Sequence, residues 1–396
     1  MTDQTVHARR DFVLVAAAFF ITMMGTTLPA PLYALYQQQL GFDAIWLTLI
    51  FSVYAAGVIA ALVLVGSWSD QLGRRPLLLA GLMMAALSAG IFLTTHSVGG
   101  LLLGRLFSGF SAGIMTGTAT VAVIESAPRA WRSHATLMAT AANMLGLGSG
   151  PLLAGFTSQY LPWPITLIFW VHLGLLLLAA FGISVARETV QRPGTLRLRI
   201  MRPHIPGEVR PVFIPAAIAG LASFSVAGVF TSLVPSIMRQ LMGQHSGLLI
   251  GAVCCLFFVA SIVGQVALQW IASARQMNVG CWGLVAGVLA LGASIFSQEL
   301  WLLLLGGFLA GAGQGMVFKA SMGAVMAACP PAQKAAVTSA LFIVFYFSMS
   351  LPVIALGFSI GPFGLSAAGE VFSVIIAAVA VVAMLKMRHA RRASAA

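Results

Sequence analysis

Long apolar runs alternate with short polar connections along almost the whole chain of 396 residues. A helix needs about 20 predominantly apolar residues to cross a bilayer, and twelve runs of about this length can be placed. They lie near residues 12–36, 44–66, 76–95, 100–123, 135–157, 164–185, 211–234, 246–270, 278–297, 300–325, 336–358 and 367–386. The pattern predicts an all-α integral membrane protein with twelve transmembrane helices.

The connections between these runs are short, except for the basic segment 187–210, which contains proline and glycine. Such a segment is typical of a linker between domains. It separates residues 1–186 from residues 211–396, and each part holds six predicted spans. We therefore expect two six-helix bundles joined by a cytoplasmic linker, with a short basic tail after the second bundle.

Composition supports a membrane location, because 60% of the residues are hydrophobic and only 8% are charged. The net charge of +12 is not spread evenly. If the N-terminus is cytoplasmic, the segments expected inside hold 18 of the 21 Lys and Arg residues. This asymmetry predicts a multi-pass protein of a bacterial-type inner membrane with both termini in the cytoplasm. It identifies the lipid bilayer as the partner and argues against nucleic acid.

Candidate chemistry is sparse. The four cysteines fall in spans or at an expected cytoplasmic edge, so they imply no disulfide framework. No cluster has metal-ligand spacing, and the sequence contains neither a phosphate-binding loop nor a nucleophile elbow. We therefore predict no metal, no cofactor and no enzymatic activity.

The two halves share short sequence matches. Leu-Leu-Leu-Gly occurs at 101–104 in the fourth span and at 303–306 in the tenth, an offset of 202 residues. Thr-Thr-Leu at 26–28 corresponds to Thr-Ser-Leu at 231–233, an offset of 205. Both Leu-Leu-Leu-Gly segments are followed by two further glycines, Gly109 and Gly113 in one half and Gly311 and Gly315 in the other. Parallel repeats predict two bundles around a central cavity, with substrate bound near the midplane.

The connection between the second and third spans combines small and charged residues. Gly66 would let the second span approach a neighbour closely. Asp70 would lie against the positive N-terminal end of the eleventh span, near Ala335. Arg74 would bridge Asp70 to Glu125, at the inner end of the fourth span. We call these residues and their neighbours the latch, a candidate lock between moving helices: Gly66, Asp70, Gly73, Arg74, Arg75 and Glu125. The alternative is a set of ordinary interfacial charges that serve topology.

Three motifs resemble those of the major facilitator superfamily. Gly66-x-x-x-Asp70-x-x-Gly73-Arg74-Arg75 resembles its loop between spans 2 and 3, and Arg105-x-x-x-Gly109-x-x-Ala112-Gly113 resembles its span-4 motif. Gly146-Leu-Gly148-Ser-Gly150-Pro151-Leu-Leu-Ala154-Gly155 resembles the span-5 motif of its twelve-span drug/proton antiporter branch. In that motif Ala154 and Leu137 stand where glycines are usual.

The resemblance implies the superfamily fold, two pseudo-symmetric six-helix bundles, in a monomer that works by alternating access. It implies that the latch stabilises the outward-facing state. In the span-5 motif it points to four residues, namely Gly146, Gly150, Pro151 and Gly155. By itself, Pro151 removes one backbone donor and permits a bend, which is also compatible with a packing kink.

Arg105 and Lys319 are the only basic residues placed well inside spans. A charge there is costly and usually functional, so both are candidates for the substrate cavity or for coupling. Snorkelling to the membrane surface is the alternative for each. A further candidate is Gln314 of the tenth span. Three polar residues of the first span are candidates too, and they serve equally as kink or interface residues: Thr26, Thr27 and Tyr33.

No predicted span carries a carboxylate near its middle. The candidate proton carriers are therefore Glu125, Asp11 and His172, and a substrate that carries the proton or uncoupled transport stays open. We interpret the chain as an exporter of small organic molecules, with protons as the coupling ion. The alternative within transport is an importer or facilitator of a small organic anion. A polytopic sensor or membrane enzyme is the alternative from another class, and no catalytic constellation supports it.

Overall fold

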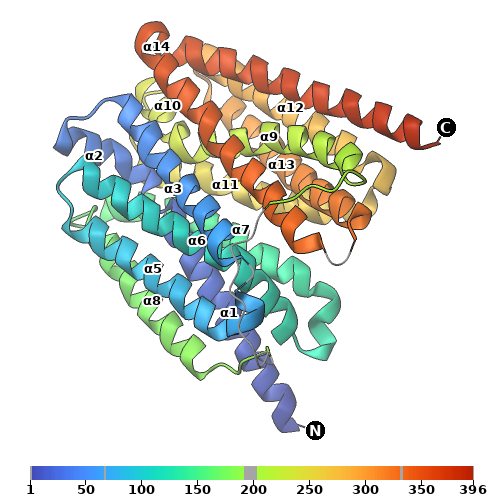
Figure 1. Cartoon of the computed structure of the whole chain (residues 1–396). Helices are drawn as coiled ribbons and strands as arrows, with labels where there is room; N and C mark the ends of the chain where they lie inside the picture. Colours follow the sequence, from blue (N-terminus) through green and yellow to red (C-terminus); the bar gives the residue numbers. More distant parts are fainter. Residues whose placement is uncertain (1, 67, 191–202, 331–332, 396) are drawn as a thin grey trace. The chain divides into compact units, whose positions relative to one another are not determined.

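The computed structural model describes residues 2–66, 68–190, 203–330 and 333–395, and all regular structure in them is helical (Figure 1). Contacts divide the chain into two units. The first comprises Met1–Phe42 with Val53–Arg202, and the second comprises Asp43–Ser52 with Pro203–Ala396. The second unit thus includes the first nine residues of the second predicted span, 44–52.

In the first unit, α1 packs against α6, α7 and α8, and α5 packs against both α6 and α8 (Figure 1). The start of α3 belongs to the second unit and the rest to the first. The elements in chain order are α1 (Thr2–Thr27), η1 (Ala30–Leu32), α2 (Tyr33–Leu40), α3 (Ala44–Val65), α4 (Ser69–Leu72), α5 (Arg74–Thr94), α6 (Val98–Ser126), η2 (Arg129–His134), α7 (Ala135–Tyr160) and α8 (Leu167–Val185).

In the second unit, α13 packs against α9, α11 and α12, and α14 packs against α9 and α12. The elements in chain order are α9 (Arg210–Ser232), α10 (Val234–Gln240), α11 (Gly247–Ala267), η3 (Leu268–Trp270), α12 (Ser273–Ser297), α13 (Leu300–Ala328) and α14 (Lys334–Ala395).

Eleven helical segments of the described chain are long and apolar enough to cross a membrane. The last of them, Lys334–Met387, has 54 residues and contains a non-helical residue, Gly364, with φ 79° and ψ 162°. It therefore holds both predicted spans 336–358 and 367–386. Helices satisfy their own backbone hydrogen bonds, as a bilayer requires. The predicted all-α membrane fold is confirmed.

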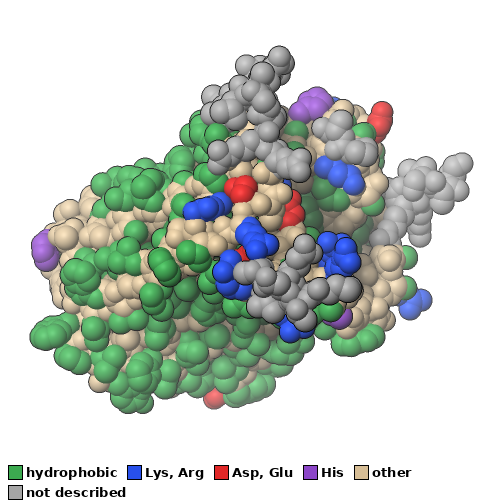
Figure 2. Space-filling view, turned by 90° about the horizontal axis from the view of Figure 1, so that it is seen from below, with side chains coloured by type: hydrophobic (Ala, Val, Ile, Leu, Met, Phe, Trp, Pro, Cys, Tyr) green, Lys and Arg blue, Asp and Glu red, His purple; other side chains and the backbone are tan. Residues whose placement is uncertain are grey.

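Apolar side chains on the surface are consistent with lipid contact. Phe296 is 79% exposed and Phe181 is 69% exposed, and such surfaces are costly in water. Figure 2 shows hydrophobic side chains over much of one face, with acidic and basic side chains gathered in one region of it. The chain is a multi-pass membrane protein.

Glycines bring the backbones of two helices together in each unit. A Cβ on Gly109 of α6 would overlap the carbonyl oxygen of Tyr54 in α3. In the second unit, a Cβ on Gly311 of α13 would overlap the carbonyl oxygen of Phe257 in α11. Close backbone approach through small residues is typical of membrane helices. Gly311 follows Gly109 by 202 residues and Phe257 follows Tyr54 by 203, which are nearly the offsets of the sequence matches. Each unit therefore repeats the same approach of one helix to another.

Candidate functional site

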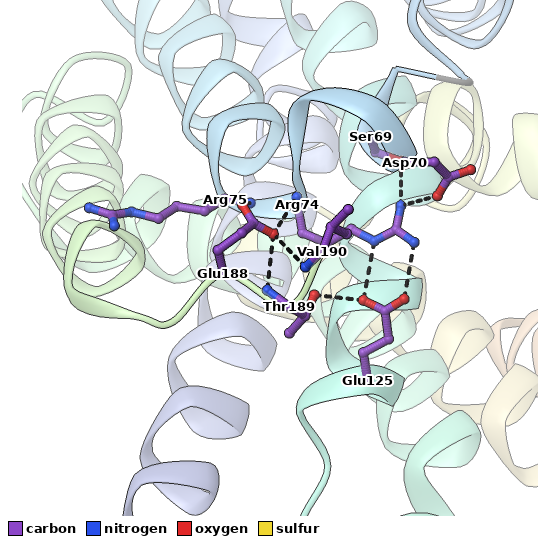
Figure 3. Close-up of polar contacts among 8 residues, drawn as sticks. All are labelled: Ser69, Asp70, Arg74, Arg75, Glu125, Glu188, Thr189 and Val190. Atoms are coloured by element: carbon purple, nitrogen blue, oxygen red, sulfur yellow. Dashed lines mark hydrogen bonds and ion pairs between the residues drawn. The ribbon is translucent and has the colours of Figure 1, made fainter. Parts of the chain in front are cut away.

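Arg74 is the centre of a cluster of polar contacts at one end of α5 and α6 (Figure 3). Its Nη1 donates to Asp70 Oδ1 at 2.6 Å and to Ser69 Oγ at 2.7 Å. Its Nε donates to Glu125 Oε2 at 3.2 Å, and its Nη2 donates to Glu125 Oε1 at 3.0 Å. The structure therefore brings together the three charged residues that the sequence placed in the latch.

The two acids of the cluster differ in their surroundings. Only 10% of the Arg74 side chain is exposed, against 34% for Glu125 and 68% for Asp70. A bidentate arginine–carboxylate pair is stronger and more directional than a single contact. An exposed pair is screened by water and contributes little. The pair with Glu125 therefore holds α5 to α6, whereas the pair with Asp70 mainly fixes the short helix α4.

The other latch residues lie around this centre. Gly73 precedes α5 and is buried, and the Arg75 side chain points away from the Arg74 guanidinium in Figure 3. Gly66 directly follows α3 and is exposed. The close approach expected of Gly66 is made by Gly57 of α3, where a Cβ would overlap the carbonyl oxygen of Leu106. The contact expected between Asp70 and the start of the eleventh span stays a prediction.

Besides Ser69, sequence reasoning missed Glu188 and Thr189, which follow α8 at the start of the linker. Both Glu188 oxygens accept backbone N–H groups of α5, and Thr189 Oγ1 donates to Glu125 Oε2 at 2.7 Å. An acid and a hydroxyl in a basic linker have no periodicity that would reveal these contacts. The uncapped start of α5, which has only glycine before it, is the one local signal.

The α7 motif contacts α1 through a defined hydrogen bond. Pro151 lies inside α7 and lacks the N–H that would bond the Leu147 carbonyl four residues earlier. Thr27 of α1 donates its hydroxyl to that carbonyl at 2.7 Å. A Cβ on Gly150 would sit 2.5 Å from Thr27 Oγ1, so glycine is required for the approach. Gly146 and Gly155 are buried in the same helix.

Arg105 is buried in the first unit and does not reach the membrane surface. It is 2% exposed, and its guanidinium lies 4.5 Å from the centre of the Tyr54 ring. Its Nη1 donates to the backbone carbonyl of Thr26. Cation–π contact and a carbonyl acceptor together offset part of the cost of burying the charge. Snorkelling is therefore not its role in this structure.

A small cavity lies beside Thr26, between α1, α5, α6 and α8. Its volume of 10 Å³ is at the lower limit of what can hold one water molecule. Its polar lining consists of Thr22, Thr26, Ser88, Ser108, Ser111 and His172. His172 contributes its ring while Nε2 contacts the Ile21 carbonyl oxygen at 3.0 Å. Tyr33 is buried as well, and its hydroxyl has no hydrogen-bond partner among the described residues.

Lys319 lies in a different environment from Arg105. It is exposed, and its Nζ donates to the Gln265 carbonyl at 2.9 Å, near the C-terminal end of α11. Carbonyls in the last turn of a helix lack a helical partner, and a cation there is favourable. Gln314 is buried and accepts a hydrogen bond from Ser261 at 2.7 Å. Both contacts join α13 to α11.

No group of three or more His, Cys, Asp or Glu in the described parts of the chain is arranged to hold a metal ion. The cluster around Arg74 is instead a set of ion pairs and hydrogen bonds between helices. Its chemistry suits a contact that forms and breaks.

Curated proteins with similar sequences include transporters named for drug resistance. The tetracycline resistance protein, class E, of Escherichia coli is 30% identical over 153 residues, which cover 38% of this chain and 38% of that protein. The multidrug resistance protein MdtL of Klebsiella pneumoniae is 24% identical over 213 residues, which cover 53% of each chain. The chain thus spans about half or less of the length of these relatives.

Solved structures share the fold over nearly the whole chain. The human organic anion transporter MFSD10 (TETRAN) is 18% identical with a TM-score of 0.68, covering 96% of this chain and 99% of that one. A bacterial homologue of the human lysosomal transporter Spinster is 13% identical with a TM-score of 0.75, covering 97% and 98%. A family model described as "Major Facilitator Superfamily" matches residues 15–353. The chain belongs to the Major Facilitator Superfamily of membrane transporters.

Proposed function

We propose that this protein exports small organic molecules by alternating access and exchanges them for protons. The bidentate Arg74–Glu125 pair carries the proposal, because it joins a titratable carboxylate to a helix contact that can open. Relatives named for tetracycline, chloramphenicol and multidrug resistance support export. The Gly150–Pro151 segment of α7, which resembles an antiporter motif, supports it as well.

Coupling follows from the contacts of Glu125. Its carboxylate accepts hydrogen bonds from the Arg74 guanidinium and the Thr189 hydroxyl. Both donors favour the ionised carboxylate. When the pair opens, those donors are lost and protonation becomes easier. Protonation of Glu125 and opening of the latch are therefore linked, which is the condition for a proton to drive the conformational cycle.

We further propose a bacterial-type inner membrane location with both termini in the cytoplasm. The distribution of Lys and Arg supports this orientation, because 18 of 21 fall in segments that would then be inside. The latch would lie at the cytoplasmic face. Labelling of cysteines introduced at each terminus, in intact cells and in inverted vesicles, tests the orientation.

Transport measurements in proteoliposomes test the function. Tetracycline and chloramphenicol serve as probes, with and without an imposed pH gradient. The proposal requires that a gradient drive accumulation of at least one probe. Glu125→Gln should abolish this accumulation and leave counterflow intact. If the variant still concentrates a probe against its gradient, Glu125 is not the proton carrier. If both modes change together, Glu125 acts only in the latch.

A second candidate function is transport of a small organic anion. The observation that favours it is Arg105, a cation buried within the first unit and close to α1. Such a charge would attract an anion that reaches it. Fluorescein in the same proteoliposomes tests this candidate, and its uptake without a pH gradient would favour a facilitator. Arg105→Ala at equal protein abundance should then reduce fluorescein transport more than Lys319→Ala.

A further inference from the structure

The chain leaves α8 at Val185 and returns to the start of α5 within three residues. Ala186 has an extended conformation, with φ −71° and ψ 150°, which ends the helix. Glu188 and Thr189 then lie over the first turn of α5 and the last turn of α6 (Figure 3). These two residues, which we call the linker clamp, belong to none of the motifs found in the sequence.

Glu188 caps α5 from a distance of more than 100 residues along the chain. Its Oε1 accepts the Arg74 N–H at 2.8 Å, and its Oε2 accepts the Arg75 N–H at 3.0 Å. Its Oε1 also accepts the N–H groups of Thr189 at 3.0 Å and Val190 at 3.1 Å. The first N–H groups of a helix have no helical partner, and a carboxylate there is favourable. Glu188 therefore supplies the cap that no residue beside α5 provides.

The glycine before α5 makes this cap possible. Gly73 has φ 105° and ψ 157°, a conformation that residues with a side chain rarely adopt. A Cβ at Gly73 would also overlap Oε2 of Glu188. The backbone conformation at position 73 thus favours glycine, and the absence of a side chain there also leaves room for the Glu188 carboxylate.

The clamp also contacts the other side of the ion pair. Thr189 Oγ1 donates to Glu125 Oε2, the same oxygen that accepts Arg74 Nε. One dipeptide therefore holds the backbone of Arg74 through Glu188 and the carboxylate partner of Arg74 through Thr189. A shift of the linker start would disturb both halves of the pair at once.

We propose that Glu188 and Thr189 are positioning residues of the latch, and that the latch opens only when the start of the linker is displaced. The linker then takes part in the conformational cycle. The role of the clamp in transport rests on the proposed function, whereas its role in holding the latch does not.

Hydrogen–deuterium exchange on the purified full-length protein tests the cap without any substrate. Glu188→Ala should speed exchange of the amides at Arg74 and Arg75 about fivefold or more, as expected when a helix cap is lost. Glu188→Gln keeps one oxygen acceptor and should give a smaller change, and it serves if the alanine variant fails to fold. Glu208→Ala, an exposed acid of the same linker, is the matched control and should change neither amide.

A double-mutant cycle separates positioning from simple local stability. Glu125→Gln should lower the thermal midpoint in the wild-type background and lower it at most half as much in the Glu188→Ala background, because loss of the cap has then already displaced Arg74. Unchanged exchange in Glu188→Ala, or additive midpoints in the cycle, would overturn the proposal. If both results are as expected and no probe is transported, the proposed function fails while the clamp stands.

Discussion

Replacing Thr27 by valine removes one hydroxyl and keeps the shape of the side chain. In the structure this hydroxyl is the donor to Leu147, whose carbonyl lost its helical partner to Pro151. Thr27 is 7% exposed, so water does not readily replace the hydroxyl. Thr27→Val should therefore leave the partly buried Leu147 carbonyl without a donor.

The expected cost follows from two limits. A buried polar group left unsatisfied costs about 1–3 kcal/mol. Side-chain hydrogen bonds measured within membrane proteins average about 0.6 kcal/mol and reach about 1.7 kcal/mol. The Leu147 carbonyl has no N–H four residues ahead, so we expect a value near the upper membrane limit, about 1.5 kcal/mol. Thr22→Val is the control, because Thr22 bonds Ala18 within regular α1 and its loss leaves that carbonyl paired in the helix.

Pro151→Ala provides the decisive comparison, because alanine restores an N–H for Leu147. Thr27→Val should then cost less than about 0.5 kcal/mol in the Pro151→Ala background. The assay is denaturant-dependent unfolding in mixed micelles, followed by tryptophan fluorescence, for both single variants and the double variant. Equal costs of Thr27→Val in the two backgrounds would refute the assignment of this hydroxyl to the proline break.

Other variants test the latch and the helix packing. Glu125→Gln should lower the unfolding free energy by about 1–3 kcal/mol, whereas Asp70→Asn, on the exposed side of Arg74, should change it by less than about 1 kcal/mol. Unfolding curves of both variants check this, and a larger effect for Asp70 would contradict our ranking. Gly109→Ala should destabilise the protein by about 1–3 kcal/mol through overpacking, whereas Gly117→Ala in the same helix meets open space and should be nearly neutral. Equal melting temperatures for the two glycine variants would show that α3 can move aside.

The helices and the charged centre of the latch could be predicted because each depends on local pattern. Apolar runs long enough to cross a bilayer predict membrane spans, whichever helices they pack against. Asp70 and Arg74 are only four residues apart, so the short loop between the second and third spans is expected to bring them together. The prediction for Glu125 required only the assumption that the end of the fourth span lies beside the start of the third.

Contacts made by residues that lie in no recognised motif and at no predicted span end could not be predicted. Glu188 is separated from Arg74 by four spans, and a linker acid has the same sequence pattern whether it caps a helix or faces water. Pro151 indicated that one carbonyl of its helix lacks a backbone donor, but nothing in the sequence predicted that Thr27 supplies the donor. For the same reason the sequence could not predict that Arg105 and Lys319 have different surroundings. The distance of a residue from the end of its span does not show which neighbour offers it a carbonyl or an aromatic ring.

The glycine contacts of α6 and α13 have an evolutionary consequence. At Gly109 and Gly311 one main chain meets another, so the fit depends on the absence of a side chain and not on its chemistry. Neighbouring residues of these helices are free to change without altering that contact. Two copies of an ancestral segment can therefore drift apart almost everywhere and still dock their helices alike. The interhelical loop has no such protection, since Asp70 needs a charged partner, and the residue that the repeat offset places opposite it in the second half, 203 positions later, is Ser273. The similarity between the two halves is therefore retained longest at these glycines, where the side chain is a single hydrogen atom.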